Sequence, residues 1–125
     1  DLDAERGRAL VAGHLARDLN SAEHLVLVAE DAAGQVIGYA GVHWLPYLFK
    51  AGPEAYVSEL FVRSDRTGQG VGRALLAALE NEARTRGCCQ LMLLNNRQRS
   101  SYQRGFFAKQ GWRERDNMAN FARPL

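Results

Sequence analysis

Apolar residues recur along this chain with two different periods, and each period predicts a different kind of element. Short runs rich in β-branched and aromatic residues predict strands at His24–Glu30, Val36–Leu45, Ala55–Val62 and Cys89–Leu94. Apolar residues at every third or fourth position predict helices at Asp3–Leu19, Val71–Arg86 and Ser100–Gln110. This mixture of elements predicts an α+β domain in which a sheet is flanked by helices.

Turn residues separate these runs and suggest how they are connected. Asp31-Ala32-Ala33-Gly34 predicts a hairpin turn between the first two strands, with glycine supplying a positive φ. Gly87 ends the long helix, and the fully apolar strand after it predicts a parallel pairing with Ala55–Val62. A final hairpin is expected at Trp112–Glu114 and Met118–Arg123.

The strand Ala55–Val62, the glycine loop after it and the following helix are the most informative stretch. The strand is expected to be buried on both faces, because apolar residues occupy both of its sides. The loop Thr67-Gly68-Gln69-Gly70-Val71-Gly72 has glycine at every second position, which favours turns closed to other residues. Unsatisfied N–H groups at a helix start favour anions, so backbone at residues 67–73 is predicted to hold a phosphate-bearing ligand. The alternative is a glycine-rich turn that only joins strand to helix.

The spacing of this loop excludes two common phosphate motifs. The dinucleotide fingerprint fails because Arg73 stands where its last glycine belongs, and the P-loop fails because no Gly-Lys-Ser/Thr follows. The stretch instead resembles the acetyl-CoA-binding motif of the GNAT superfamily of N-acetyltransferases, Gln/Arg-x-x-Gly-x-Gly/Ala. Gly70 and Gly72 match its glycines, and Thr67 takes the first position.

The last third of the chain extends the resemblance. Asn95-Asn96 and the run from Phe107 to Gly111-Trp112 fit the asparagine and the Tyr-x-x-x-Gly-Phe that follow the fifth strand in GNAT domains. Phe107 replaces the tyrosine of that pattern. The resemblance runs from about His24 to the C-terminus and implies a single GNAT domain over residues 1–125, whose first strand would precede Asp1.

The resemblance implies a fold and a set of residues that bind acetyl-CoA as co-substrate. The sheet would be mixed and mostly antiparallel, with a parallel central strand pair that splays apart to admit the pantetheine arm. The residues expected to bind the cofactor are Leu60, Phe61, Val62, Thr67, Gly68, Gln69, Gly70, Val71, Gly72, Arg73 and Asn96. One backbone amide of the strand would also polarise the thioester carbonyl. The implied reaction is direct transfer of an acetyl group to a primary amine in a ternary complex.

Two catalytic candidates follow. Glu59 is a carboxylate in an apolar strand, where burial would raise its pKa toward the range of a useful general base. The alternative for Glu59 is a solvated residue or a structural ion pair. Tyr102 is the nearest phenol to the position that Phe107 occupies, and packing or substrate contact is the alternative to a role as general acid.

Composition and charge indicate which kinds of partner and which cellular compartment to expect. A net charge of +2 gives no reason to expect a nucleic-acid partner, although the basic Ser100–Gln110 segment leaves that hypothesis testable. No apolar run is as long as a membrane span, and His14 has no second metal-type residue at helical spacing, so neither membrane nor metal is expected. Cys88 and Cys89 are interpreted as two buried free thiols of a cytoplasmic protein.

Two functional hypotheses therefore remain. The first is an acetyl-CoA-dependent N-acetyltransferase acting on an unidentified amine, such as a polyamine-like amine, an aminoglycoside, an amino acid or a protein amine. The second is a GNAT domain that binds acyl-CoA with weak or absent catalysis, for which Phe107 is the supporting observation. A homodimer through Met118–Arg123 is also open.

Overall fold

The computed structural model describes residues 22–125, and the chain divides into two compact units after Leu94. The expected helix Asp3–Leu19 lies outside the described residues. Each unit is described by itself.

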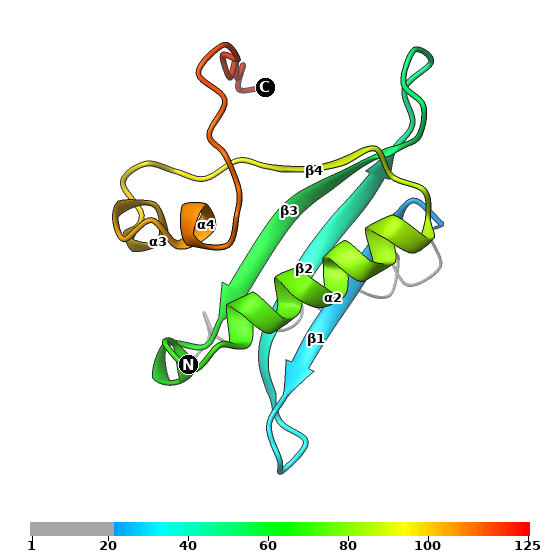
Figure 1. Cartoon of the computed structure of the whole chain (residues 1–125). Coiled ribbons are helices and arrows are strands. Elements are labelled where there is room, and N and C mark those ends of the chain that lie inside the picture. The colour runs from blue at the N-terminus through cyan, green and yellow to red at the C-terminus, as the bar shows by residue number, and fades with distance from the viewer. Residues whose placement is uncertain (1–21) are drawn as a thin grey trace. The chain divides into compact units, whose positions relative to one another are not determined.

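The first unit is a four-stranded mixed sheet with one long helix across its face (Figure 1). Its elements in chain order are β1 (His24–Glu30), β2 (Val36–Leu45), β3 (Glu54–Val62), the short 3₁₀ helix η1 (Ser64–Arg66), α2 (Val71–Thr85) and β4 (Gln90–Leu93). The strand order is β1-β2-β3-β4, with antiparallel pairing up to β3 and parallel pairing between β3 and β4. The predicted mixed sheet with a parallel strand pair is confirmed.

The core of this unit lies between α2 and one face of the sheet. The buried residues on α2 are Leu75, Leu76, Leu79 and Ala83, and those facing them from the sheet include Ala40, Val42, Trp44, Ala55 and Val57. Burying each leucine side chain contributes about 1.5–3 kcal/mol relative to leaving it in water. Packing of this apolar face, more than helix propensity, therefore holds α2 on the sheet.

Gly38 determines how closely the start of α2 approaches the sheet. A Cβ atom at Gly38 would lie 2.9 Å from the Phe61 carbonyl oxygen and 3.1 Å from Cγ1 of Val71. Only a residue without a side chain leaves room for that approach. The first turn of α2 thus lies close beside the end of β3.

The predicted turns and stops of the first unit are confirmed. Gly34 has φ of +79°, and the Asp31 carboxylate accepts hydrogen bonds from the N–H groups of Ala33 (2.9 Å) and Gln35 (3.0 Å). Gly87 has φ of +70° directly after α2, and the Cys88 N–H returns to the Ala83 carbonyl at 2.9 Å.

The second unit, Asn95–Leu125, departs from its prediction in two places. The single helix expected over Ser100–Gln110 is two short helices, α3 (Ser100–Gln103) and α4 (Phe106–Lys109), because Gly105 turns the chain with φ of +69°. The final hairpin expected at Trp112–Glu114 and Met118–Arg123 is absent, since residues 113–125 form no strand and are all exposed. The apolar residues Met118 and Phe121 of this segment remain exposed, and an isolated two-stranded hairpin that buries no apolar surface is marginal in water, which explains this error.

Among the described residues, no helix is long and apolar enough to cross a membrane.

Candidate functional site

The second half of β3 has a free edge on the side of β4. The parallel pairing runs from Glu54 opposite Gln90 to Val57 opposite Leu93 and then stops. From Glu59 to Val62, β3 pairs with β2 and with no other strand among residues 22–125, and β4 runs away from it (Figure 1). Backbone donors and acceptors on that edge are therefore available to an extended ligand.

A β-bulge explains where the two parallel strands separate. In the β2–β3 register, Gly41 pairs with Glu59 and the next residue, Val42, pairs with Val57, so Ser58 is an extra residue. A bulge bends the strand and increases its local twist. The bulge at Ser58 follows directly on Val57, the last residue that β4 pairs with, so the strands part where β3 changes course.

The direction of the backbone groups on this edge follows from one hydrogen bond. The Arg63 N–H donates to the Ile37 carbonyl of β2 at 2.8 Å. Because backbone groups alternate in direction along a strand, those of Leu60 and Val62 face away from β2, toward the free edge. Of the three strand residues expected to bind cofactor, two present backbone there, and Phe61 presents its backbone to β2.

The glycine loop has the backbone conformation expected of it at two of its three glycines. Gly68 and Gly70 have φ of +76° and +84°, and no atom lies within 4 Å of where a Cβ would stand at either. Gly72 lies inside α2 and has no positive φ, so the expectation of a special turn at this third glycine was wrong. Thr67 is exposed, and its hydroxyl donates to the Ser64 carbonyl at 3.2 Å.

The start of α2 adjoins the end of this loop. Gly70 is its N-cap residue and provides no side-chain capping hydrogen bond. The first intrahelical bond runs from the Ala74 N–H to the Gly70 carbonyl at 3.0 Å, which leaves the N–H groups of Val71, Gly72 and Arg73 without an intrahelical acceptor. Three N–H groups and the positive end of the helix dipole thus lie beside an exposed loop, as an anion site requires.

Two arginines beside the loop are held by carboxylates. Arg63 contacts Asp65 at 2.6 and 3.1 Å, and this raises the pKa of Arg63 while it lowers the pKa of Asp65. Arg66 donates to the Asp31 carboxylate at 3.3 Å, across the sheet end from the β1–β2 turn. Arg73 is exposed on the first turn of α2. The Arg66–Asp31 contact therefore connects the segment before the glycine loop to the β1–β2 hairpin turn.

Glu59 lies on the face of the sheet opposite α2, and it is exposed. The prediction that it is buried in an apolar strand was wrong. The prediction that β3 is buried on both faces was also wrong, because Ser58 and Phe61 are exposed as well. Beyond Val57 no strand among residues 22–125 pairs with β3 on the side of β4, and Ser58, Glu59 and Phe61 are open to water there. The charge of Glu59 does reach Tyr39, whose pKa is raised by burial first and by this carboxylate second.

Two of the predicted site residues belong to the second unit. The Asn96 side-chain oxygen accepts a hydrogen bond from the Gln98 N–H at 2.8 Å and so forms part of the turn before α3. The Tyr102 hydroxyl donates to Glu114 at 2.9 Å, and this bond raises the pKa of Tyr102. Arg97 donates to the other oxygen of Glu114, and the two contacts lower the pKa of that carboxyl.

Phe107 occupies the position at which a phenol was looked for, and its role within the second unit is packing. Its ring lies edge-on to Phe106 at 5.0 Å and to Trp112 at 6.0 Å between centroids. The Trp112 N–H also donates to the Phe107 carbonyl at 3.0 Å. These contacts stabilise the short helix pair and leave no hydroxyl at this position.

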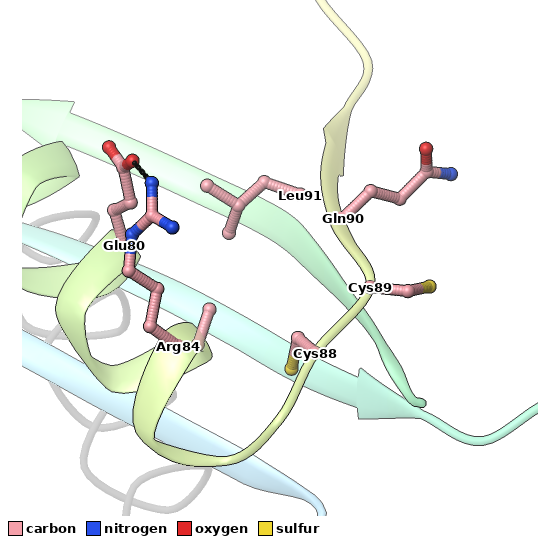
Figure 2. Close-up of a pocket in the computed structure, with 7 residues that line it drawn as sticks. Glu80, Arg84, Cys88, Cys89, Gln90 and Leu91 are labelled. Carbon is pink, nitrogen blue, oxygen red and sulfur yellow. Dashed lines mark hydrogen bonds and ion pairs between the residues drawn. The ribbon is translucent and has the colours of Figure 1, made fainter. Parts of the chain in front are cut away.

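A hollow of about 230 Å³ lies elsewhere in the first unit, at the C-terminal half of α2 (Figure 2). It is lined by Glu80, Ala83, Arg84, Cys88, Cys89, Gln90 and Leu91. Glu80 and Arg84 pair at 2.7 Å on the α2 side of it, and the glycine loop at the other end of the helix contributes no residue. The hollow is therefore separate from the candidate site.

The two cysteines are free thiols, as predicted, but they differ in exposure. Cys88 is half-buried and burial raises its pKa, whereas Cys89 is exposed, so the prediction of two buried thiols was wrong. Their side chains point apart in Figure 2. Among residues 22–125, no group of three His, Cys, Asp or Glu side chains could hold a metal ion.

The structure thus assembles in one unit the strand edge, the loop and the helix start, which the sequence placed in order along the chain. Sequence reasoning missed Ser58 and Gly41, because a bulge leaves no periodic signal. It also missed the contact of Asp31 with the loop. The hairpin turn at Asp31-Ala32-Ala33-Gly34 was predicted, but the partner of Asp31 in the loop region, Arg66, is 35 residues away in the sequence.

Comparison with known proteins gives a consistent result. A family model described as the acetyltransferase (GNAT) family matches residues 3–112. Glucosamine 6-phosphate N-acetyltransferase 1 of Oryza sativa is 33% identical over 97 residues, which cover 76% of this chain and 56% of that protein. An L-methionine sulfoximine/L-methionine sulfone acetyltransferase of Pseudomonas aeruginosa is 43% identical over 63 residues, 50% of this chain and 36% of that protein.

Solved structures agree in fold. A transcriptional regulator from Bacillus halodurans has a TM-score of 0.79 at 22% identity and covers 91% of this chain and 74% of its own. An aminoglycoside acetyltransferase from an uncultured soil metagenomic sample has a TM-score of 0.78 at 21% identity, over 90% of this chain and 73% of its own. The matched part of this chain spans between about a third and just over half of the length of the two curated relatives above. Since the family model covers most of the sequence, the chain belongs to the acetyltransferase (GNAT) family.

Proposed function

We propose that this chain is an acetyl-CoA-dependent N-acetyltransferase that passes the acetyl group directly to a primary amine. The observation that carries the proposal is the free edge of β3 at residues 58–62, which ends at an exposed glycine loop and an uncapped helix start. An extended arm with amide groups suits the strand edge, and a pyrophosphate suits the helix start. Pantetheine and the diphosphate of CoA supply these two groups in that order.

The proposed roles follow the geometry. Backbone of Leu60 and Val62 would bind the pantetheine arm, and one of the two N–H groups would polarise the thioester carbonyl. The N–H groups of the loop and first helical turn would hold the pyrophosphate, assisted by Arg73. The cofactor contacts predicted for Phe61 and Asn96 remain proposals, with the Asn96 oxygen already engaged in its turn.

The chemistry needs two proton movements. Glu59 is proposed to take a proton from the ammonium of the acceptor, after which the nitrogen attacks the thioester carbon, the C–N bond forms and the C–S bond breaks. CoA leaves as a thiolate and takes up a proton from water or from an acid. Tyr102 is the proposed acid, and its hydroxyl donates a hydrogen bond to Glu114, which raises the pKa of Tyr102. A thiolate is a good leaving group, so this second role is the less demanding one.

The alternative is a domain that binds acyl-CoA without turnover, and Phe107 is the observation that favours it. The acceptor also belongs to the proposal, since the named relatives act on different amines. A location in the cytoplasm fits the use of acetyl-CoA and stays a prediction. A homodimer stays a prediction as well, although the strand expected to mediate it is absent.

Calorimetric titration with acetyl-CoA tests the cofactor assignment. The wild type is expected to bind, and Leu60→Pro is expected to bind at least tenfold more weakly, because proline removes an N–H that faces the free edge. Phe61→Pro is the control, since it removes an N–H that faces β2 and should lower the unfolding temperature more than Leu60→Pro does. No binding by the wild type, or unchanged binding by Leu60→Pro, would refute the assignment.

Product formation distinguishes the enzyme from the binding module. Acetyl-CoA is incubated with L-methionine sulfone, glucosamine 6-phosphate and an aminoglycoside, and acetylated amine is measured by mass spectrometry. Glu59→Gln is expected to lower the rate at pH 7 by tenfold or more and to approach the wild type near pH 10, where an amine of pKa about 10 is already half deprotonated. A rate that Glu59→Gln leaves unchanged at pH 7 would remove Glu59 as the base.

A further inference from the structure

Gly38 of β2 lies where the two parts of the proposed cofactor site meet. One part is the free edge of β3, and the other is the start of α2 with its N–H groups that have no intrahelical acceptor. Gly38 is buried and pairs with Val62 at the end of β3. The first turn of α2 lies beside the same end of β3 (Figure 1). Gly38 therefore adjoins both parts of the site.

A side chain at Gly38 would be wedged between strand and helix. A Cβ built there lies 2.9 Å from the Phe61 carbonyl oxygen, 3.1 Å from Cγ1 of Val71 and 3.3 Å from Cδ1 of Leu75. Phe61 belongs to the free part of β3, and Val71 is the first residue of α2. Because protein interiors are close-packed, these atoms could make room only by shifting. The missing side chain of Gly38 thus sets the spacing between the end of β3 and the first turn of α2.

Two contacts hold the strand side of this junction in place. The Arg63 N–H donates to the Ile37 carbonyl at 2.8 Å, so the end of β3 is bound to β2 directly before Gly38. Arg66 donates to the Asp31 carboxylate at 3.3 Å, which connects η1 to the β1–β2 turn. With the strand end held in this way, we expect a side chain at Gly38 to displace chiefly the start of α2.

The spacing matters because acetyl-CoA, on the proposed function, binds both parts of the site at once. Its pantetheine arm and its diphosphate are covalently joined, so binding of the arm raises the effective concentration of the diphosphate at the helix start. This gain is lost when the two parts no longer match the span of the ligand. Moving the helix start would lengthen its hydrogen bonds to the diphosphate and leave the strand edge unchanged.

We propose that Gly38 is a positioning residue for acetyl-CoA. Through Val71, it places the start of α2 at the distance from the β3 edge at which one molecule can bind both. This inference rests on the proposed function and adds to it a buried residue that acts through the helix rather than by contact with the cofactor.

Two donors that differ in the diphosphate test the proposal. S-acetylpantetheine has the thioester and the arm of acetyl-CoA and lacks its diphosphate and nucleotide. Gly38→Ala is expected to weaken acetyl-CoA binding about tenfold or more and to leave S-acetylpantetheine binding unchanged, because only the first ligand uses both parts. Calorimetric titration measures the Kd of acetyl-CoA, and competition with acetyl-CoA measures that of S-acetylpantetheine. The wild type should bind acetyl-CoA more tightly than S-acetylpantetheine.

Val71→Ala alters the same contact from the helix side. It removes the methyl group that faces Gly38, and since Val71 is half-buried, this variant is expected to fold. It should weaken acetyl-CoA binding several-fold and leave S-acetylpantetheine binding unchanged, and it decides the test if Gly38→Ala does not fold. Leu79→Val is the control, because it removes a methylene from the core further along α2. It should lower the unfolding temperature and change neither Kd.

The outcomes separate this inference from the proposed function. Equal losses for both donors in Gly38→Ala and Val71→Ala would overturn the inference, because the effect would then lie in the β3 edge or in the whole fold. Unchanged acetyl-CoA binding in both variants would also overturn it, and so would a wild type that binds the two donors equally. A wild type that binds neither donor overturns the proposed function, and the inference with it.

Discussion

Gly70 and Gly34 both have a positive φ, but only Gly70 lies in the candidate site. Gly70 and Gly34 have nearly the same φ, +84° and +79°, and neither has an atom within 4 Å of a built Cβ. Alanine at either position should therefore cost a similar free energy of folding, about 1–3 kcal/mol for a strained backbone. Only Gly70 adjoins the helix start.

Comparing alanine variants of these two glycines separates the effect of backbone strain on stability from an effect on acetyl-CoA binding. Gly70→Ala and Gly34→Ala are expected to lower the unfolding temperature by similar amounts, and only Gly70→Ala should weaken acetyl-CoA binding. Thermal unfolding and calorimetric titration of both variants measure the two effects. Equal affinities in the two variants would show that the conformation at Gly70 matters for the fold alone.

Residue-level predictions succeeded for backbone conformation, which depends on the residue itself. They failed for side-chain burial, which depends on the neighbouring elements of the fold. The turn glycines Gly34, Gly70 and Gly87 were predictable because a left-handed conformation is cheap only for glycine. The burial of Glu59 was not predictable, since it depends on where β4 leaves β3. The exposure of Cys89 likewise depends on its place just before β4 rather than within it.

At the scale of elements, an ion pair ties the glycine loop to the β1–β2 hairpin. Asp31 accepts hydrogen bonds from two backbone N–H groups of its own turn and one from Arg66. The bond from the Gln35 N–H is the largest cause that lowers the pKa of Asp31, followed by the bond from Ala33 and by the charge of Arg66. A carboxyl whose pKa is lowered on folding stabilises the protein above its ordinary pKa, and loses this contribution as the pH falls.

Asp31→Asn should therefore lower the unfolding temperature at pH 7, and the difference from the wild type should shrink below about pH 4. Asp65→Asn is the control, because Asp65 is 64% exposed in its pair with Arg63 and an exposed pair contributes little. Thermal unfolding between pH 3 and pH 7 measures both. A difference for Asp31→Asn that is constant with pH would assign the effect to the turn geometry and not to the charge.

The elements themselves were largely predictable. The first two strands have the predicted bounds, and α2 ends one residue before the prediction, because apolar periodicity and turn residues agree along those segments. The hairpin predicted at Trp112–Glu114 and Met118–Arg123 is absent, because apolar residues such as Met118 and Phe121 form a strand only where a surface can bury them, and both are exposed. Gly105 divides Ser100–Gln110 into α3 and α4. The division was not predicted, because an isolated glycine within a helical pattern is often compatible with a continuous helix.

At the scale of the whole molecule, the sequence predicted the family and the order of the site's elements along the chain. It predicted the three-dimensional geometry of the site less well. The family model covers residues 3–112 and so draws on both compact units, and solved structures at 21–22% identity share the fold. The strand edge, loop and helix start were predicted because they are consecutive in the chain. The bulge at Ser58 and the contact of Arg66 with Asp31 depend on residues far apart in the chain, and tertiary contacts of this kind have no signature in one sequence.

The bulge at Ser58 has a consequence for how an enzyme of this design could diversify. On the proposed function, β3 serves two molecules at once, because its main chain binds the cofactor and its Glu59 side chain takes a proton from the acceptor. Main-chain contacts do not depend on residue identity, so the thioester would keep its place while the side chains around Glu59 are exchanged. Recognition of a new amine would then require no change in the handling of acetyl-CoA, and substrate range could evolve independently of the reaction.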